Sequence, residues 1–167
     1  MSIEKVRSYL EPYGVADRIR EFEVSSATVQ LAAAALGVDE ARIAKSLSFH
    51  TGGGCMIIVM AGDVKVDNHL FKQQFGFKAR MLSAEDALLM TGHAVGGVCP
   101  FAVPADVKVF LDEALKRFAT VFPACGTAAS AIELAPDELK ACLPGAEWIA
   151  VSKPIEEILN YCHISGP

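Results

Sequence analysis

Lys45 is the first residue whose type and position suggest chemistry. After Lys45, from Ser46 to Phe49, the chain alternates polar and apolar residues, which is the period of a half-buried β-strand. Lys45 has the parity of the apolar residues, so a strand that begins there directs its ammonium toward the apolar face. An unpaired ammonium is costly to bury. The pattern therefore indicates either a lysine at the mouth of a strand, with its stem buried and its head in water, or a functional lysine aimed inward.

The second candidate is the segment "GGVCP", residues 96–100. Its two glycines reach backbone dihedrals that other residues avoid, so backbone N–H groups can approach a ligand closely, and the proline fixes the following bend. Such a loop can present amides to a carbonyl or phosphate oxygen, and an ordinary wide turn is the alternative. Neither the dinucleotide pattern G-x-G-x-x-G nor the phosphate-loop pattern G-x-x-x-x-G-K-[ST] occurs in the sequence.

The five cysteines and four histidines are dispersed along the chain. No C-x-x-C pair and no zinc-ligand spacing appears, so the sequence predicts no metal site. Cys99 and Cys125 are candidate nucleophiles, but a catalytic cysteine needs a base and an orienting group. His93 is near Cys99 in sequence, and nothing in the sequence shows that the two side chains meet. Most of the cysteines are therefore expected to fill the core.

The composition is that of a folded globular protein with one domain over residues 1–167, since 52% of the residues are hydrophobic and 21% are charged. No apolar run approaches the ~20 residues of a membrane helix, and residues 1–14 lack the core of a signal peptide. We therefore expect a cytoplasmic protein with no membrane partner. The net charge of −5 argues against a protein that grips a long nucleic acid alone. Residues 65–80 still form a local basic cluster, either a phosphate-binding surface or a solvated helix face.

Periodicity, capping residues and turn residues predict the secondary structure. Strands are predicted at 20–24, 45–50, 55–61, 79–82, 106–112, 120–126, 130–135 and 146–152. Helices are predicted from residue 2 to about residue 12, and at 25–37, 38–44, 66–76, 83–92, 113–118, 136–143 and 155–167. Ser25 or Ser26 is expected to cap the helix at 25–37, Asp67 the helix at 66–76 and Ser83 the helix at 83–92. Residues 93–104 have no regular period.

These elements amount to eight short strands and eight helices, and several of the helices span about two turns or fewer. Because helices and hairpins are mixed along the chain, a regular βαβ repeat does not fit. The sequence predicts an α+β fold: a single domain with a curved, mixed, mostly antiparallel sheet surrounded by helices. The strand at 55–61 is apolar on both faces and should be central in that sheet.

Four segments carry a resemblance to a known family. In chain order they are "TVQLAAAALGVDEARIAKSLSF" with Lys45, "MIIVMAGDVKVD", "GGVCPF" with its G-x-x-x-P spacing, and "CGTAASAIELAPDEL". With these segments the sequence resembles the YbaK/ProX family of aminoacyl-tRNA deacylases, which are freestanding relatives of the editing insertion domain of bacterial prolyl-tRNA synthetase. The resemblance covers roughly residues 20–153, and four segments in register make it fairly specific.

The resemblance implies a mixed α+β fold with a highly curved sheet. It also implies a reaction, the hydrolysis of the ester that joins a wrongly attached amino acid to the 3′ end of a tRNA. Lys45 would point toward a concave site, where an RNA phosphate or the ester carbonyl compensates its charge. Amides at Gly96 and Gly97 would bind the ester carbonyl while a water or a ribose hydroxyl attacks. The substrate-binding residues implied are Thr28, Val98, Cys99, Pro100, Phe101 and Gly126.

The substrate and the partners are less sharply defined. Some family members carry Arg and Asp where this chain has Ala128 and Ala131, so substrate choice is open, with Ala, Ser, Thr or Cys as the expected targets. No metal or organic cofactor is implied, and the partners are mischarged tRNA and, as a further option, an aminoacyl-tRNA synthetase. Two alternatives stand beside the deacylase: a tRNA- or synthetase-binding module of the same fold without catalysis, and a hydrolase that uses Cys99 or Cys125.

Overall fold

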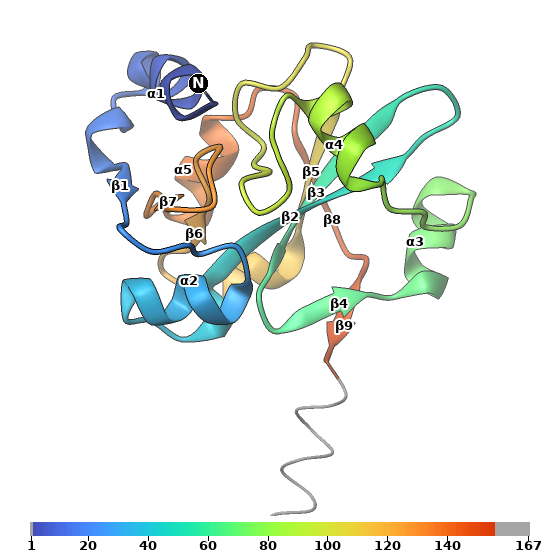
Figure 1. Ribbon diagram of the computed structural model, residues 1–167. Coiled ribbons are helices and arrows are strands. Elements are labelled where there is room, and N and C mark those ends of the chain that lie inside the picture. The colour runs from blue at the N-terminus through green and yellow to red at the C-terminus, as the bar shows by residue number, and fades with distance from the viewer. Residues whose placement is uncertain (1, 156–167) are drawn as a thin grey trace, which may run out of the picture.

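A five-stranded mixed sheet forms the centre of the structure, a computed structural model that describes residues 2–155 (Figure 1). Its strands lie in the order β6–β2–β3–β5–β8. They are β2 (Ile43–His50), β3 (Cys55–Ala61), β5 (Lys108–Asp112), β6 (Phe122–Pro123) and β8 (Glu147–Ile149). The α+β class with a mixed sheet is confirmed. The longest pairing, β2 with β3, is antiparallel as expected, but the other pairings of this sheet are parallel.

Two short antiparallel ribbons lie beside this sheet. β1 (Arg20–Glu21) pairs with β7 (Ser130–Ala131), and β4 (Val64–Val66) pairs with β9 (Ser152–Pro154). In Figure 1 the first ribbon is on the left of the sheet and the second is below it. The β4–β9 ribbon is continuous with β3 through a tight turn at Gly62 and Asp63, so it is held close to one end of the central hairpin.

Five α-helices surround the sheet in the described part of the chain. They are α1 (Ser2–Leu10), α2 (Val29–Leu36), α3 (Asn68–Phe75), α4 (Ala84–Thr91) and α5 (Pro136–Ala141). Short 3₁₀ turns occur at Glu11–Tyr13, Ala16–Arg18, Glu40–Arg42 and Glu113–Arg117. In Figure 1, α1 and α5 lie on one side of the sheet and α3 and α4 on the other. No helix among the described residues is long and apolar enough to cross a membrane.

Side-chain caps fix where three of the helices begin. Asp67 accepts the Leu70 N–H at the start of α3, and Ser83 accepts the Asp86 N–H at the start of α4, which confirms the predicted caps. The prediction for α2 is wrong, because Thr28 caps that helix in place of Ser25 or Ser26. Ser26 cannot serve there, since its hydroxyl and its backbone N–H both donate to the Ala128 carbonyl.

β3 is the centre of the core, as its apolar pattern predicts. All of its residues are buried, because β2 and β5 cover its two edges and helices and loops cover its faces. An aromatic cluster of Phe71, Phe75 and Phe110 closes one side, with ring centroids 4.7 and 5.2 Å apart. Burying a large apolar side chain contributes about 1.5–3 kcal/mol, so this core holds the hairpin that carries Lys45 rigidly in place.

Several predicted strands are shortened or divided. The strand at 20–24 ends at Glu21, and the segment at 79–82 makes only an isolated bridge from Met81 to Phe49. The strand at 146–152 divides into β8 and β9, because the buried Asp112 carboxylate accepts the Val151 N–H and the Ser152 hydroxyl and draws the chain toward β4. The three-residue strand β4 was too short to predict. The helix predicted at 155–167 lies almost wholly outside the described residues.

Candidate active site

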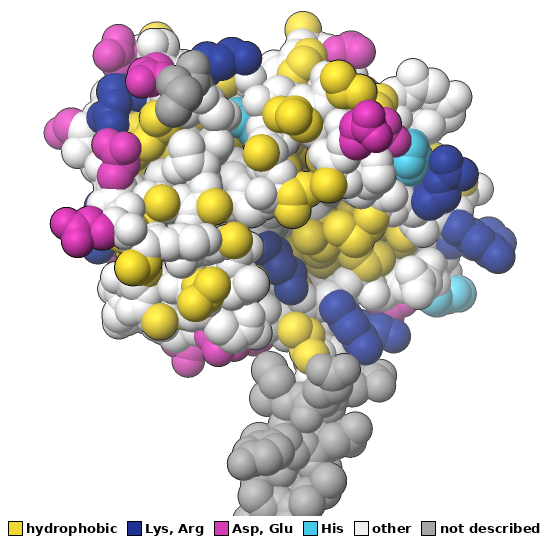
Figure 2. Space-filling view, in the orientation of Figure 1, with side chains coloured by type: hydrophobic (Ala, Val, Ile, Leu, Met, Phe, Trp, Pro, Cys, Tyr) yellow, Lys and Arg dark blue, Asp and Glu magenta, His cyan; other side chains and the backbone are white. Residues whose placement is uncertain are grey.

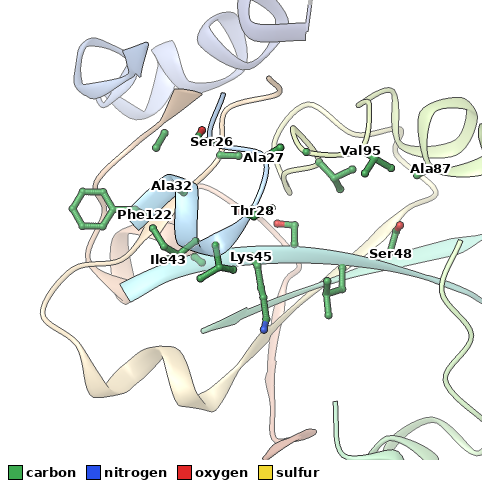
Figure 3. A pocket seen from close by; sticks show the side chains of 18 of the residues that line it. Ser26, Ala27, Thr28, Ala32, Ile43, Lys45, Ser48, Ala87, Val95 and Phe122 are labelled. Atoms are coloured by element: carbon green, nitrogen blue, oxygen red, sulfur yellow. The ribbon is translucent and has the colours of Figure 1, made fainter. Parts of the chain in front are cut away.

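A cavity of about 300 Å³ lies between β2, the segment before α2 and the loop after α4 (Figure 3). β2 from Ile43 to Ser48 forms one wall, and Val95, Gly96 and Val98 of the loop form the opposite wall. The segment Ser26–Val29 also lines the cavity. The remaining lining is mostly apolar: half of it is alanine, at positions 32, 87, 124 and 131, and Met81, Leu82 and Phe122 are larger. This cavity therefore admits a compact ligand with a small apolar group.

Lys45 lines this cavity, but its ammonium is held outside the space between the walls. Lys45 Nζ donates to the carbonyl oxygen of Val64 and, at 3.4 Å, to that of Gly62. Burial lowers the pKa of Lys45, and the nearby Asp63 carboxylate opposes that shift. Figure 3 shows the side chain leaving β2 on the side away from Ser48 and Val95. In this structure the carbonyls of the β3–β4 turn compensate the inward-facing ammonium.

The glycines of the 96–100 loop mark close contacts between backbones. Gly96 has a φ of 93°, and an added Cβ would lie 3.2 Å from the Ala27 Cβ. A Cβ on Gly97 would lie 2.7 Å from the carbonyl carbon and oxygen of Gly126, which cannot move as a flexible side chain could. The Gly97 N–H donates to the Ala94 carbonyl at 2.9 Å. Gly96 and Val98 thus face the cavity, while Gly97 and Gly126 pack together behind it.

His93 closes the loop from behind. Its imidazole is 1% exposed, and Nε2 lies 2.7 Å from the Phe101 carbonyl oxygen. Because a carbonyl only accepts, Nε2 carries the proton, and Nδ1 then accepts from the Ser2 hydroxyl at 2.6 Å. Burial lowers the pKa of His93, which favours this neutral form. The two ends of the loop, at residues 93 and 101, are therefore tied to each other and to α1.

The cysteine alternative finds a histidine but no base. Cys99 Sγ lies 3.5 Å from His93 Nε2, so the two side chains that the sequence could not connect do meet. That nitrogen is already a donor to Phe101, so it cannot take the thiol proton. Cys99 is fully buried, and burial raises the pKa of its thiol to about 12. Burial also raises the pKa of Cys125. Neither geometry activates a thiolate nucleophile.

The structure brings together only part of the predicted site. Thr28, Lys45, Gly96 and Val98 line one cavity. The Thr28 hydroxyl also accepts the Leu31 N–H at 3.1 Å as the cap of α2, so it has a structural role as well. The other predicted residues lie behind the cavity wall, where they support the loop: Gly97, Cys99, Pro100, Phe101 and Gly126.

Ser46 is a cavity residue that the sequence analysis did not select. Its Oγ is buried and is the side-chain oxygen or nitrogen that stays without a hydrogen-bond partner in the described part of the chain. The signal was present, because the alternation that groups Lys45 with apolar residues places Ser46 and Ser48 on the opposite face. A buried unpaired hydroxyl is unfavourable, so Ser46 is suited to bind a polar atom of a ligand.

The edge of β2 is also open beside Ser46. β6 pairs with Ile43 and Ala44, and the segment ending at Leu82 pairs beyond Leu47, so no described strand covers the residues between. The Ser48 carbonyl accepts from Leu82 across this edge, and backbone groups of alternate residues point the same way. The N–H and C=O of Ser46 are therefore directed at the uncovered edge, next to its hydroxyl.

Comparison with known proteins agrees with this arrangement. The sequence profile of the aminoacyl-tRNA editing domain matches residues 23–142. The chain belongs to the aminoacyl-tRNA editing domain family. It is 52% identical over 157 residues to "Uncharacterized protein YwhH" of Bacillus subtilis (strain 168), covering 93% of this chain and 100% of that protein.

Two further relatives are more distant. The chain is 28% identical over 109 residues to "Putative Cys-tRNA(Pro)/Cys-tRNA(Cys) deacylase EbsC" of Enterococcus faecalis (strain ATCC 700802 / V583), covering 64% of this chain and 66% of that one. A solved structure, "Crystal structure of a putative trans-editing enzyme for prolyl tRNA synthetase", superposes with a TM-score of 0.82 and 29% identity, covering 91% and 97% of the two chains. The YbaK/ProX-type resemblance and the fold it implies are thus confirmed for this editing domain.

The side chains that could ligate a metal are dispersed in the described part of the chain. Among residues 2–155, no group of three or more His, Cys, Asp and Glu side chains is arranged to hold a metal ion.

Proposed function

We propose that this protein is a trans-editing deacylase that hydrolyses the ester between a small amino acid and the 3′-terminal ribose of a mischarged tRNA. The observation that carries the proposal is the small cavity on whose walls Thr28, Lys45, Gly96 and Val98 meet in a member of the editing domain family. The partner is mischarged tRNA, with an aminoacyl-tRNA synthetase as a further partner, and the compartment is the cytoplasm.

The reaction needs little more than orientation and charge stabilisation. Water, or a ribose hydroxyl next to the ester, adds to the carbonyl carbon; the acyl–oxygen bond then breaks, the ribose oxygen takes a proton, and the amino acid leaves. Backbone N–H groups at Gly96 and Val98, which line the cavity, would bind the oxygen on which negative charge develops, a contact whose loss typically costs about 10²–10³ in rate. Ser46 Oγ and the open edge of β2 would hold polar atoms of the aminoacyl group.

Substrate choice would follow from the size of the cavity. Alanines at 27, 32, 124 and 131 leave room for a small side chain beside β2. A pocket of this kind separates one methylene by only ~1–3 kcal/mol, so neighbouring small amino acids should compete. We therefore propose amino acids of the Ala, Ser, Thr or Cys class as substrates. Larger side chains would be excluded by the limited volume of the cavity.

One observation supports the non-catalytic alternative, a tRNA- or synthetase-binding module. The Lys45 ammonium already has two carbonyl partners, so it is not free in this structure to act on a substrate. In that case the intact loop would only hold the acceptor end of the tRNA. Binding without turnover is the property that would separate this module from the deacylase.

The test is a panel of tRNAs charged with Ala, Ser, Thr, Cys and Pro, incubated with catalytic amounts of purified protein. We expect multiple-turnover release of at least one small amino acid and little release of proline from correctly charged prolyl-tRNA. Stoichiometric binding of the same tRNAs with no release above the buffer rate would favour the binding module instead.

A further inference from the structure

The β4–β9 ribbon places two lysines directly opposite each other. In its register Lys65 of β4 faces Lys153 of β9. Directly opposed residues of an antiparallel pair project from the same face. Val64 is buried on the inner face, so Lys65, which alternates with it, is on the outer face and is exposed. Lys153 is half-buried, so two lysine side chains, one exposed and one partly covered, leave neighbouring positions on the outer face of this ribbon.

This register is fixed, and it is electrostatically unfavourable. Backbone bonds extend the pairing at both ends, from Asp67 N–H to the Val151 carbonyl and from Ile155 N–H to the Asp63 carbonyl. Like charges directly opposite destabilise a strand pair. No salt bridge between described residues involves Lys65 or Lys153, and the Asp63 carboxylate is paired with Arg117. The Asp67 carboxylate is near enough to Lys153 for that lysine to help lower the pKa of Asp67, so it offsets part of the repulsion without forming an ion pair.

The third lysine near this ribbon comes from the cavity. Asp63 and Asp67 direct backbone groups toward β9. Val64 has the opposite parity along the strand, so its carbonyl is directed toward the other edge of β4. Lys45 Nζ donates to that carbonyl, while the stem of Lys45 lines the cavity. The Lys45 side chain thus connects the cavity to the ribbon, and positive charge continues from one to the other.

We propose that the β4–β9 ribbon binds the phosphodiester backbone of the RNA strand that leads into the cavity, through Lys65 and Lys153. This inference rests on the proposed function and names how the same substrate is held outside the site of hydrolysis. An ester bound in the cavity would send its next phosphates out past Lys45 and onto the ammonium groups of Lys65 and Lys153. In Figure 2, Lys and Arg side chains predominate over acidic ones on the lower right, whereas most acidic side chains lie on the left.

The experiment uses a synthetic RNA hairpin that carries no amino acid and ends in four single-stranded nucleotides at its 3′ end, so that binding is measured without turnover. Dissociation constants are measured against salt for the wild type, Lys65→Gln, Lys153→Gln and the double variant. Lys108→Gln is the matched control, because Lys108 is exposed on β5 and lies outside the ribbon. Each lost contact should lower the log–log salt slope by about 0.7, and Lys108→Gln should leave it unchanged.

Thermal unfolding of the free variants is the second readout. Because the lysines repel each other, each single substitution should raise the melting temperature or leave it unchanged at low salt, while RNA binding weakens. Unchanged salt slopes in the double variant would overturn the proposal even if the wild type deacylates tRNA. The proposal would also be overturned if the double variant lost the binding to a polyglutamate peptide that the wild type shows and kept its RNA binding. That result would assign the ribbon to an acidic protein partner. Weakened RNA binding without any turnover would support the ribbon and count against the deacylase.

Discussion

The two walls of the cavity are built in different ways. The wall formed by β2 is regular: seven residues from Ala44 to His50 pair with β3, and their position depends mainly on backbone hydrogen bonds. The opposite wall is the irregular loop of residues 94–100. It depends on a few specific contacts, namely the hydrogen bond from His93 to the Phe101 carbonyl and the packing of Gly97 on Gly126. Changes in β2 should therefore be tolerated better than changes in the loop, and activity should respond most to the loop.

Gly97→Ala is expected to have the largest effect. Its Cβ would lie 2.7 Å from the carbonyl group of Gly126 and from the Thr127 Cα, so the loop must shift away from its support. A displacement of about 1 Å in a catalytic group can cost about 10²-fold in rate. We expect kcat/KM for a mischarged tRNA to fall by about 10² or more, measured on protein whose folding is checked by circular dichroism.

Gly53→Ala is the control for that substitution. Gly53 lies in the turn between β2 and β3, and a Cβ there would meet nothing within 4 Å. This variant should keep both activity and stability. If Gly97→Ala were as active as Gly53→Ala, the loop would tolerate displacement and the contrast between the two walls would fail.

Lys45→Met tests the regular wall and is expected to have a smaller effect. Methionine keeps most of the apolar stem but removes the ammonium, which leaves the carbonyls of Gly62 and Val64 without that donor. A buried group left unsatisfied costs about 1–3 kcal/mol. The protein should still fold, with a reduced free energy of unfolding in urea, and turnover should fall by about 10-fold or more, below the loss expected for an oxyanion donor.

Activity per folded molecule decides what Lys45 does. If it is unchanged in Lys45→Met while the free energy of unfolding falls, the lysine only holds the β3–β4 turn. Lys45→Arg is a useful comparison, because it keeps the charge but presents a planar donor group that fits the two carbonyls differently. Recovery of stability in Lys45→Arg without recovery of turnover would indicate that the substrate needs the ammonium itself.

How far the sequence predicts this molecule differs between the same two walls. Alternation from Ser46 to Phe49 and the apolar run of β3 predict the hairpin correctly, since strand periodicity depends on neighbouring residues. Capping by Asp67 and Ser83 is local as well. Parallel pairing of β3 with β5 joins segments some 50 residues apart, and no local pattern encodes it.

The loop wall could be located from sequence but not built. Its glycines and proline indicated an irregular segment, yet the contacts of His93 with Ser2 and of Gly97 with Gly126 join distant parts of the chain. The destination of the Lys45 ammonium was missed for the same reason. Parity predicts the face from which a side chain leaves a strand, whereas its hydrogen-bond partners depend on the turn that packs against that face.

His93 gives a smaller, pH-dependent effect. Burial lowers its pKa below the ordinary value of 6.5. Between the folded and unfolded pKa values only the unfolded chain binds the proton, so the free energy of unfolding should fall as the pH drops below about 6.5, by at most about 1.4 kcal/mol per pH unit. Urea titrations at pH 7 and pH 5.5 should show this loss in the wild type. His93→Gln, which can still donate to the Phe101 carbonyl, should show less of it. Equal losses in the two proteins would mean that carboxylates alone account for the acid sensitivity.

Cys99→Ser is expected to have the smallest effect, because Cys99 only supports the loop wall. Its thiol is fully buried with a pKa raised to about 12, and the nearest histidine nitrogen is already a donor to Phe101. A serine hydroxyl can still donate to that carbonyl, so kcat/KM should change by no more than a few fold. Iodoacetamide should likewise leave the activity of the folded protein intact, since a thiolate is the species that reacts. An inactive Cys99→Ser beside a normal Gly97→Ala would reverse the ranking of contacts in the loop and establish the cysteine as the nucleophile.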